Sequence, residues 1–241
     1  MTADRKPKIV ALTGAGVSAE SGIMTFRDSG GLWENHAVSD VATPEGFARN
    51  PKLVWNFYRE RYRKAIEASP NPGHYALSRI EEMFGERFWL ITQNVDGLHQ
   101  RAGSHNVLEM HGSLHTCFCT DCLRHYPTKE ILDQNPIPYC SACGAMLRPD
   151  IVWFGEIPYH LDKIEVLLQN CDIFLVIGTS GAVYPAAGFV MTTKYMGART
   201  LGFNLEKPLN SNFFDEFVQG KTGDTLPQYV KRLEQAYCNT D

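Results

Sequence analysis

The sequence predicts an α/β fold built on a parallel sheet with helices on both faces. Six short apolar segments recur along the chain with helical patterns between them, and most of them end in small or polar residues. Continuous apolar runs are typical of parallel strands, which are buried on both faces. In order, we expect strands at KIVALTGAG (8–16), RFWLITQN (87–94), NVLEMHGS (106–113), DIVWFGE (150–156), DIFLVIGTS (172–180) and RTLGFNLE (199–206).

Two stretches interrupt this alternation. Residues 44–83 have helical periodicity, and residues 114–149 are rich in cysteine with little periodicity. We expect both to be inserts that form a smaller lobe. Ligands of open parallel sheets bind beyond the carboxyl ends of the strands, where GAG, TQN, HGS, FGE, GTS and NLE lie.

Composition and charge restrict the function. Of 241 residues, 44% are hydrophobic and 21% charged, as in soluble globular proteins. A net charge of −4 argues against a general nucleic-acid binder, which needs a basic surface. The apolar run at 173–178 is too short to cross a bilayer, and the polar first residues carry no signal core. We expect a cytoplasmic protein without membrane contact, whose seven cysteines are metal ligands or buried thiols rather than disulfides.

The first strand leads into a glycine loop, TGAGVSAESG. Gly14, Gly16 and Ala19 have the G-x-G-x-x-A spacing that lets a backbone approach a pyrophosphate at a helix N-terminus. The acid that usually follows about twenty residues later is missing, although Asn204 and Glu206 end the sixth segment. By itself the loop fits a dinucleotide site and a purely structural turn equally well.

The four central cysteines predict a metal site. Cys119-x-x-Cys122 and Cys140-x-x-Cys143 are separated by the 15–20 residues typical of paired zinc-binding turns. Four protein ligands complete a tetrahedron and leave no position for a reacting water, so this zinc would be structural. The alternative is four unrelated free thiols. Cys171 and Cys238 are expected to be packing or surface thiols.

Polar residues also follow the second and third segments. Gln93, Asn94 and Asp96 cluster where a sugar or amide could bind, and His111 follows the next apolar run. A single histidine is more often structural than catalytic. Trp153, in VWFGE, is by composition a core residue. The helical stretch FYRERYR (57–63), taken alone, is a solvated helix face.

Taken together, GAGVSAESGIMTFR, TQNVDGLH, HGS, the paired C-x-x-C turns, VWFGE, GTS and NLE resemble the sirtuin family of NAD-dependent protein deacylases. The resemblance runs from Lys8 to Val230. It implies a single catalytic domain with a Rossmann-type NAD lobe (1–34, 84–113 and 150–241), a helical insert (35–83), a zinc-binding insert (114–149) and a substrate cleft between the lobes. It also implies that the adenosine ribose is held late in the chain, which matches Asn204 and Glu206.

The resemblance implies a role for each motif. Residues 14–33 would wrap the NAD phosphates and ribose, while residues 93–96 would hold the nicotinamide half and residues 178–180 the adenosine half. His111 would be the general base, and VWFGE would pair through its backbone with an extended substrate peptide. The implied cofactor residues are Gly14, Ala15, Gly16, Glu20, Phe26, Arg27, Trp33, Gln93, Asn94, Asp96, Gly178, Thr179, Ser180, Asn204, Glu206 and Thr222; the implied substrate residues are Val152, Trp153, Phe154 and Gly155.

The helical stretch gains a function from the same resemblance. In sirtuins that remove succinyl and malonyl groups, a Tyr-x-x-Arg pair lines the acyl pocket. Tyr58 and Arg61 match it, and their spacing puts both on one helix face. One departure is Met24-Thr25, where many relatives have proline and aspartate. Bacterial-type relatives also vary at this position, so the departure does not predict loss of activity.

The implied reaction is removal of acetyl, and of succinyl or malonyl, groups from lysine in proteins. NAD would be consumed, and the products would be free lysine, nicotinamide and O-acyl-ADP-ribose. Three alternatives remain at this point: a hydride-transferring dehydrogenase, a zinc-stabilised binding module and a protein ADP-ribosyltransferase. A dehydrogenase would yield reduced NAD, whereas a binding module would not consume NAD.

Overall fold

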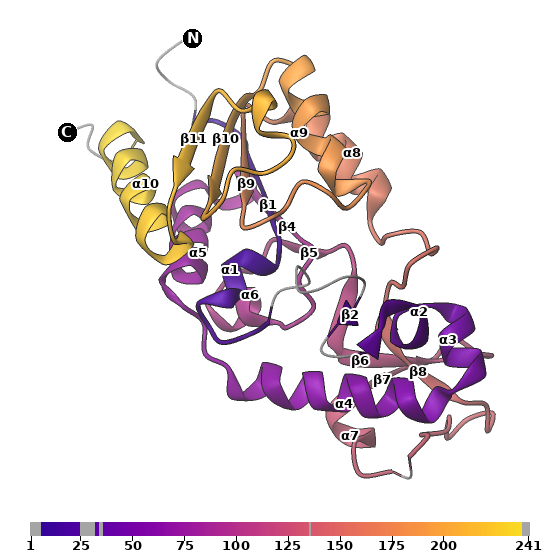
Figure 1. Cartoon of the computed structure of the whole chain (residues 1–241). Helices are drawn as coiled ribbons and strands as arrows, with labels where there is room; N and C mark the ends of the chain where they lie inside the picture. The colour runs from indigo at the N-terminus through magenta and orange to yellow at the C-terminus, as the bar shows by residue number, and fades with distance from the viewer. Residues whose placement is uncertain (1–5, 25–31, 34–35, 135, 238–241) are drawn as a thin grey trace.

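The computed structural model describes residues 6–24, 32–33, 36–134 and 136–237. The chain forms a large lobe around one sheet and a small lobe that carries the cysteine turns (Figure 1). Two further helical turns are η1 (Gly85–Arg87) and η2 (Ser211–Phe213). Among the described residues, no helix is both long and apolar enough to cross a membrane.

The large lobe contains a six-stranded sheet whose neighbouring strands are all parallel. Numbered by their order along the chain, its strands run 3-2-1-4-5-6, which is the order of Rossmann folds. The predicted α/β class is therefore confirmed. Across the sheet the strands are β5 (Val107–Glu109), β4 (Phe88–Thr92), β1 (Ile9–Thr13), β9 (Ile173–Ile177), β10 (Arg199–Asn204) and β11 (Glu216–Gln219).

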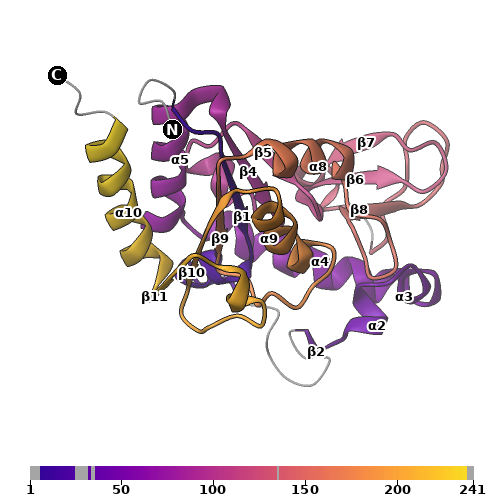
Figure 2. The same cartoon turned by 90° about the horizontal axis from the view of Figure 1, so that it is seen from above.

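Helices cover both faces of this sheet (Figures 1 and 2). Ile9 and Ala11 of β1 pack in a core with α5 (Pro72–Phe84) and α10 (Thr222–Tyr237). Val10 and Leu12 point the other way, into a core with α8 (Leu161–Asn170) and α9 (Ala186–Tyr195). All five residues of β1 are buried, which explains its unbroken apolar sequence.

The small lobe has its own core. Its antiparallel sheet contains β7 (His125–Pro127), β6 (Gly112–Cys119) and β8 (Leu147–Ile151). The long helix α4 (Pro51–Glu67) is capped at its N-terminus by Asn50, whose side chain accepts a hydrogen bond from the Leu53 amide. The helix packs on β6 and β8.

The remaining short elements of the whole chain are α1 (Ala15–Ala19), β2 (Leu32–Trp33), β3 (His36–Ala37), α2 (Val38–Val41), α3 (Pro44–Arg49), α6 (Leu98–Arg101) and α7 (Thr128–Ile131).

The expected parallel strand at DIVWFGE is wrong. β8 ends at Ile151, and it pairs antiparallel with β6 in the small lobe rather than with the large sheet. A buried strand under α4 has the same apolar pattern as a strand of a parallel sheet, so the sequence does not separate them. The sixth parallel strand is instead β11, whose short, half-buried sequence is not apolar enough to stand out.

The predicted lobe boundaries also shift at α5. This helix was expected in the helical insert, but it packs against α10 and the large sheet. The predicted zinc-binding insert at 114–149 likewise contains most of a sheet, with β6 reaching back to Gly112. Gly112 has a φ of +81°, and a Cβ there would collide with the Asp150 carbonyl. A side chain at this position would separate β6 from β8.

Candidate active site

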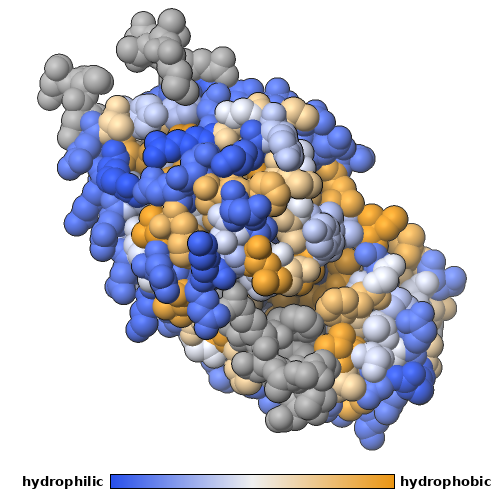
Figure 3. Space-filling model, turned by 45° about the horizontal axis from the view of Figure 1, so that its top comes forward, coloured by the Kyte–Doolittle hydropathy of each residue, from blue (hydrophilic) through white to orange (hydrophobic). Residues whose placement is uncertain are grey.

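A cavity of about 790 Å³ opens at the carboxyl ends of β1 and β9 and extends to the small lobe. These two strands are neighbours at the point where the strand order reverses, which is where such sheets bind ligands. On the face drawn in Figure 3, hydrophobic surface gathers between the two lobes. The predicted residues that line the cavity are Gly14, Ala15, Gly16, Glu20, Tyr58, Arg61, Gln93, Asn94, Asp96, His111, Val152, Trp153, Phe154, Gly155, Gly178, Thr179, Ser180, Asn204, Glu206 and Thr222.

The glycine loop is clamped directly onto the loop after β9. The Gly16 amide donates to the Gly178 carbonyl at 2.8 Å, and the Gly14 amide donates to Ile177. A Cβ on Gly16 would lie 2.7 Å from the Gly178 Cα, so no side chain fits there. Gly14 and Gly16 therefore let the glycine loop pack directly against the loop after β9, and both loops line the cavity.

Polar side chains under this loop form one hydrogen-bonded group. The Ser18 hydroxyl donates to Asp96 Oδ2 at 2.7 Å, and the Leu98 amide donates to Oδ1. Asn94 Nδ2 donates to the Ser18 hydroxyl at 3.0 Å and to the Gly14 carbonyl at 3.1 Å. Since these bonds already fix Asp96 and Asn94, both can hold a ligand with little loss of side-chain freedom.

Two buried histidines complete the group, and the sequence reasoning missed both. His74 Nε2 lies 3.5 Å from the Ser18 hydroxyl, and its Nδ1 accepts from the Asn71 amide at the start of α5. Burial lowers the pKa of His74 to about 4. The ring of His99 lies 4.8 Å from that of His74, and burial lowers its pKa well below the ordinary value. For His74 the sequence did contain an indication, because Asn71-x-x-His74 is a helix-capping pattern that predicts a fixed histidine at the start of α5.

His111 sits where the chain passes from the large sheet to the small one, between β5 and β6. It is half-buried and lines the cavity. Burial lowers the pKa of its imidazole, while a hydrogen bond to the Gln93 backbone opposes part of this shift. The ring is therefore neutral at pH 7 and able to accept a proton.

The end of the cavity beside β10 is assembled from strand ends. Asn204 Nδ2 donates to the Thr179 carbonyl at 2.9 Å, which ties the end of β10 to the loop after β9. Glu206 is exposed and lines the cavity. Glu20 accepts from the Thr222 hydroxyl at 2.9 Å and from the Gly223 amide at 3.0 Å. Glu20 thus stabilises the start of α10, where a negative charge is favourable.

On the small-lobe side, Tyr58 and Arg61 both line the cavity, and they share one face of α4 as their spacing predicted. Both residues are buried. The Trp153 side chain is also buried and donates from its indole nitrogen to the Tyr58 hydroxyl at 2.9 Å. Phe154, next in sequence, is 47% exposed and faces solvent at the same rim.

The VWFGE backbone is already partly bonded. The amides of Val152, Trp153 and Phe154 donate to His111, Glu156 and Ala42 respectively. The Trp153 carbonyl also accepts a hydrogen bond, from the Glu156 amide at 3.0 Å.

Arg59 corrects the view of α4 as partly solvated. It was expected on a wet face with Arg63, but it is buried and donates to the carbonyls of Pro136 (2.9 Å) and Gln134 (3.1 Å). The wet face does exist, because Glu60 and Lys64 form an exposed ion pair at 3.3 Å. Arg59 instead holds the loop that precedes the second cysteine turn.

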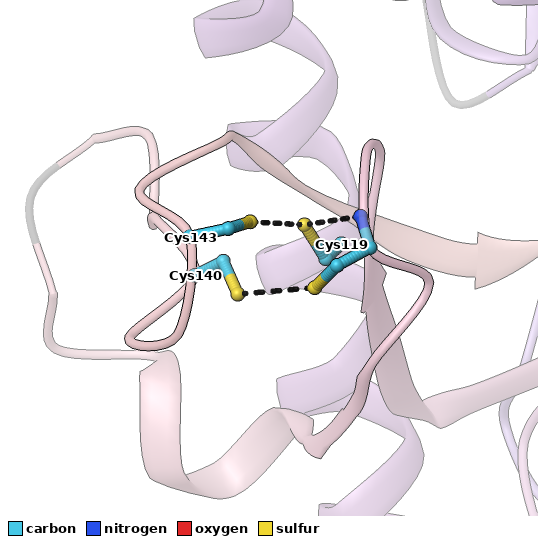
Figure 4. Close-up of side chains that lie close together, drawn as sticks. Cys119, Cys140 and Cys143 are labelled. Carbon is cyan, nitrogen blue, oxygen red and sulfur yellow. Dashed lines mark hydrogen bonds between the residues drawn. The ribbon is translucent and has the colours of Figure 1, made fainter.

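The cysteine cluster has the geometry of a zinc site (Figure 4). The sulfurs of Cys119 and Cys143 are 3.4 Å apart, those of Cys122 and Cys140 are 3.6 Å apart, and all four lie within 4.8 Å of one another. Zn–S bonds of about 2.3 Å in a tetrahedron imply sulfur separations of about 3.8 Å. A hydrogen bond from Tyr126 is the main cause that lowers the pKa of the Cys140 thiol to about 6, which favours the thiolate a metal needs.

Three predicted cofactor residues cannot be placed. Phe26 and Arg27 lie outside the described residues, and Trp33 belongs to β2 but its side chain is not described. They stay predictions.

Comparison with known proteins decides the family. The model of the Sir2 family matches residues 14–185, which contain the glycine loop, His111 and the four cysteines. The chain belongs to the Sir2 family. The predicted resemblance to sirtuins is thereby confirmed.

Bacterial and eukaryotic sirtuins are similar over nearly the whole chain. An "NAD-dependent protein deacylase" of Pasteurella multocida is 48% identical, covering 95% of this chain and 99% of the relative. The "NAD-dependent protein deacylase SIR2rp3" of Leishmania major is 50% identical, covering 93% and 95%. A solved structure of a Sir2 homolog–NAD complex superposes with a TM-score of 0.89 at 39% identity, covering 96% of this sirtuin and 91% of that chain.

Proposed function

We propose that this sirtuin is an NAD-dependent protein-lysine deacylase that transfers the acyl group to ADP-ribose. The observation that carries the proposal is that the glycine loop, His111 and the pair Tyr58 and Arg61 all line the same cavity. The names of the similar relatives support the same activity, and the NAD complex of a Sir2 homolog supports the cofactor.

The large lobe holds the NAD. The glycine loop and residues 178–180 surround the phosphates and adenosine, with Asn204 and Glu206 at the adenosine ribose. Gln93, Asn94 and Asp96 hold the nicotinamide half. When bound, NAD supplies an electrophilic ribose carbon and a cationic nicotinamide leaving group. The fixed side chains of Asn94 and Asp96 keep this half oriented while the leaving group departs.

His111 is the general base. The amide oxygen of the acyl-lysine would attack the ribose carbon as nicotinamide leaves, and neutral His111 would then take a proton from a ribose hydroxyl, so that this oxygen attacks the acyl carbon. The lysine amine would leave with a proton. A water molecule would then attack the acyl carbon that bridges the two ribose oxygens, leaving the acyl group as an ester on one oxygen and a hydroxyl at the other. A positioned base contributes about 10²–10⁴-fold to such a step.

Tyr58 and Arg61 give the enzyme activity on acyl groups that end in a carboxylate. A guanidinium matches the two oxygens of a carboxylate, and a phenol adds a neutral donor. We therefore propose that succinyl- and malonyl-lysine are substrates beside acetyl-lysine.

The zinc supports the fold rather than the reaction. Its four cysteine ligands leave no open coordination position, and Figure 4 shows Cys119, Cys140 and Cys143 on turns beside strands of the small lobe. We propose a reducing, cytoplasmic setting on the cysteine usage of the sequence, whose paired C-x-x-C turns are typical of metal ligands rather than of disulfides. The acidic net charge supports protein rather than nucleic acid as the direct partner.

The proposal is tested by incubating the protein with acetyl- and succinyl-lysine peptides, with and without NAD. We expect peptide deacylation only with NAD, together with nicotinamide release and no absorbance of reduced NAD. His111→Ala should lower the rate at least about 10²-fold while NAD still binds. Reduced NAD would indicate a dehydrogenase, a peptide that gains ADP-ribose would indicate a transferase, and near-normal turnover by His111→Ala would remove the base role.

A further inference from the structure

The hydroxyl of Tyr58 has a defined partner on one side. The Trp153 indole Nε1 donates to it at 2.9 Å, and both side chains are only 2% exposed. Their rings are 6.4 Å apart and tilted by 36°. An indole nitrogen only donates, so in this bond the Tyr58 oxygen must be the acceptor.

Trp153 itself is held from two sides. The Arg148 guanidinium lies 3.6 Å from the centre of the indole ring, and Arg148 makes a paired ion contact with Glu156 at 2.7 and 2.9 Å. Glu156 also accepts from the Trp153 amide at 2.8 Å. The ring also packs on that of Phe47, with the two ring centroids 5.4 Å apart. The direction of the indole N–H is therefore fixed by the small lobe.

This bond determines what the Tyr58 hydroxyl can offer to a ligand. One of its lone pairs is occupied by the indole N–H, so its own proton points elsewhere. Within the part of the chain that the structure describes, no side-chain or backbone atom accepts that proton, and Tyr58 lines the cavity. Burial raises the pKa of the hydroxyl, which keeps it protonated.

We propose that Trp153 is a positioning residue for acyl selectivity, whose indole N–H turns the Tyr58 hydroxyl into a donor aimed at an acceptor in the cavity. The chemical class it favours is an acyl chain ending in a carboxylate. The inference rests on the proposed deacylase function. It gives a task in the reaction to a tryptophan that composition assigns to the core.

The test compares kcat/KM for succinyl- and acetyl-lysine peptides in wild type, Trp153→Phe, Tyr58→Phe and the double variant. Trp153→Phe keeps an aromatic ring but removes the N–H. We expect it to lower the succinyl-to-acetyl ratio about 2- to 10-fold, mainly through KM for succinyl peptide, as befits one hydrogen bond. In the Tyr58→Phe background the same substitution should leave the ratio within about 2-fold, because the group it acts through is gone.

The chain offers a matched control in Trp55→Phe. Trp55 is also a buried small-lobe indole, but its N–H donates to the Leu147 carbonyl at 2.8 Å rather than to the Tyr58 hydroxyl. The Trp55→Phe variant should be less stable than wild type but have the same succinyl-to-acetyl ratio of kcat/KM. Should Trp153→Phe not fold, Glu156→Gln loosens the Arg148 clamp while keeping the indole, and it should shift the ratio in the same direction only when Tyr58 is present.

Each outcome has a distinct meaning. Equal losses on both acyl peptides, or a ratio shift that persists without the Tyr58 hydroxyl, would overturn the positioning role of Trp153 and leave the deacylase function intact. Wild-type activity on acetyl- but not succinyl-lysine would do the same. Absence of NAD-dependent deacylation with either peptide would overturn the proposed function, and the inference with it.

Discussion

Arg61 is the side chain on which we expect acyl selectivity to depend most directly. It is buried at the small-lobe wall of the cavity, three residues after Tyr58 on α4. Arg61→Met removes the charge and keeps most of the length. A hydrogen bond to a charged group contributes about 1.5–3 kcal/mol, so we expect roughly a 10- to 150-fold loss in kcat/KM for succinyl-lysine peptide. Acetyl-lysine has no carboxylate to lose, and its rate should change little or rise.

The proper control for this measurement is Arg63→Met. Arg63 is exposed on the same helix, whereas Arg59 is buried and holds the loop at Gln134 and Pro136. Arg63→Met should be nearly silent on both substrates, and Arg59→Met should lower stability. Equal losses on succinyl and acetyl peptides in Arg61→Met would show that Arg61 is structural.

At this scale the sequence identifies side chains that belong to a linear motif and misses those defined by distant partners. Tyr58 and Arg61 could be paired because they match a short motif of the resembling family, and their spacing puts both on one helix face. The burial of Arg59 could not, because its partners are backbone carbonyls 75 and 77 residues away. His74 was missed for the same reason, because the Ser18 hydroxyl that it contacts lies 56 residues away in the sequence.

Among the elements, α5 makes stability depend on pH through its first turn. His74 accepts from the Asn71 amide there, and the bond requires a neutral Nδ1. Burial lowers the pKa of His74 to about 4, below the value of about 6.5 in an unfolded chain. The unfolded state therefore binds more protons between these values, and stability present above pH 6.5 is lost as pH falls toward 4. The loss is at most about 3 kcal/mol from this group.

Denaturant unfolding at several pH values between 7 and 4.5 measures this effect. We expect the free energy of unfolding to fall with pH more steeply in wild type than in His74→Gln, by up to about 1.4 kcal/mol per pH unit. His105→Gln, at an exposed histidine, should keep the wild-type slope. Identical slopes for wild type and His74→Gln would contradict a neutral, buried His74.

The antiparallel sheet of the small lobe depends on zinc. Metal binding energy is largely folding energy in such small units. Wild-type protein should contain one equivalent of zinc by elemental analysis, and Cys143→Ser should lose it and unfold at lower temperature. Cys171→Ser, at a buried thiol outside the cluster, should retain the metal. Zinc-free protein that is folded and active would contradict a structural metal.

The elements were predictable where their pattern is unambiguous. β1, β4, β9 and β10 are continuous apolar runs that end at functional turns, and all lie in the parallel sheet as expected. β8 has an equally apolar sequence but belongs to the other sheet, because pairing depends on tertiary contacts that a local pattern does not contain. β11 was missed for the opposite reason, since its edge position requires little burial.

In the whole molecule, function arises where the two lobes meet. The Rossmann lobe brings the glycine loop, residues 93–96 and the loop after β9 to one edge of its sheet, and the small lobe adds Tyr58, Arg61 and the VWFGE segment. His111 lies on the connection between the two sheets. The order of the motifs along the chain predicted this arrangement only through the family resemblance, because no local pattern states which strand ends become neighbours.

The central claim is that this cavity moves an acyl group from lysine to the sugar of NAD. Mass spectrometry of the nucleotide product, formed from NAD and an acetyl- or succinyl-lysine peptide, tests it most directly. We predict ADP-ribose that carries the acyl group of the peptide supplied, in equal amount to nicotinamide and deacylated peptide. Unmodified ADP-ribose accompanied by free carboxylate, without any acylated nucleotide at early times, would contradict it.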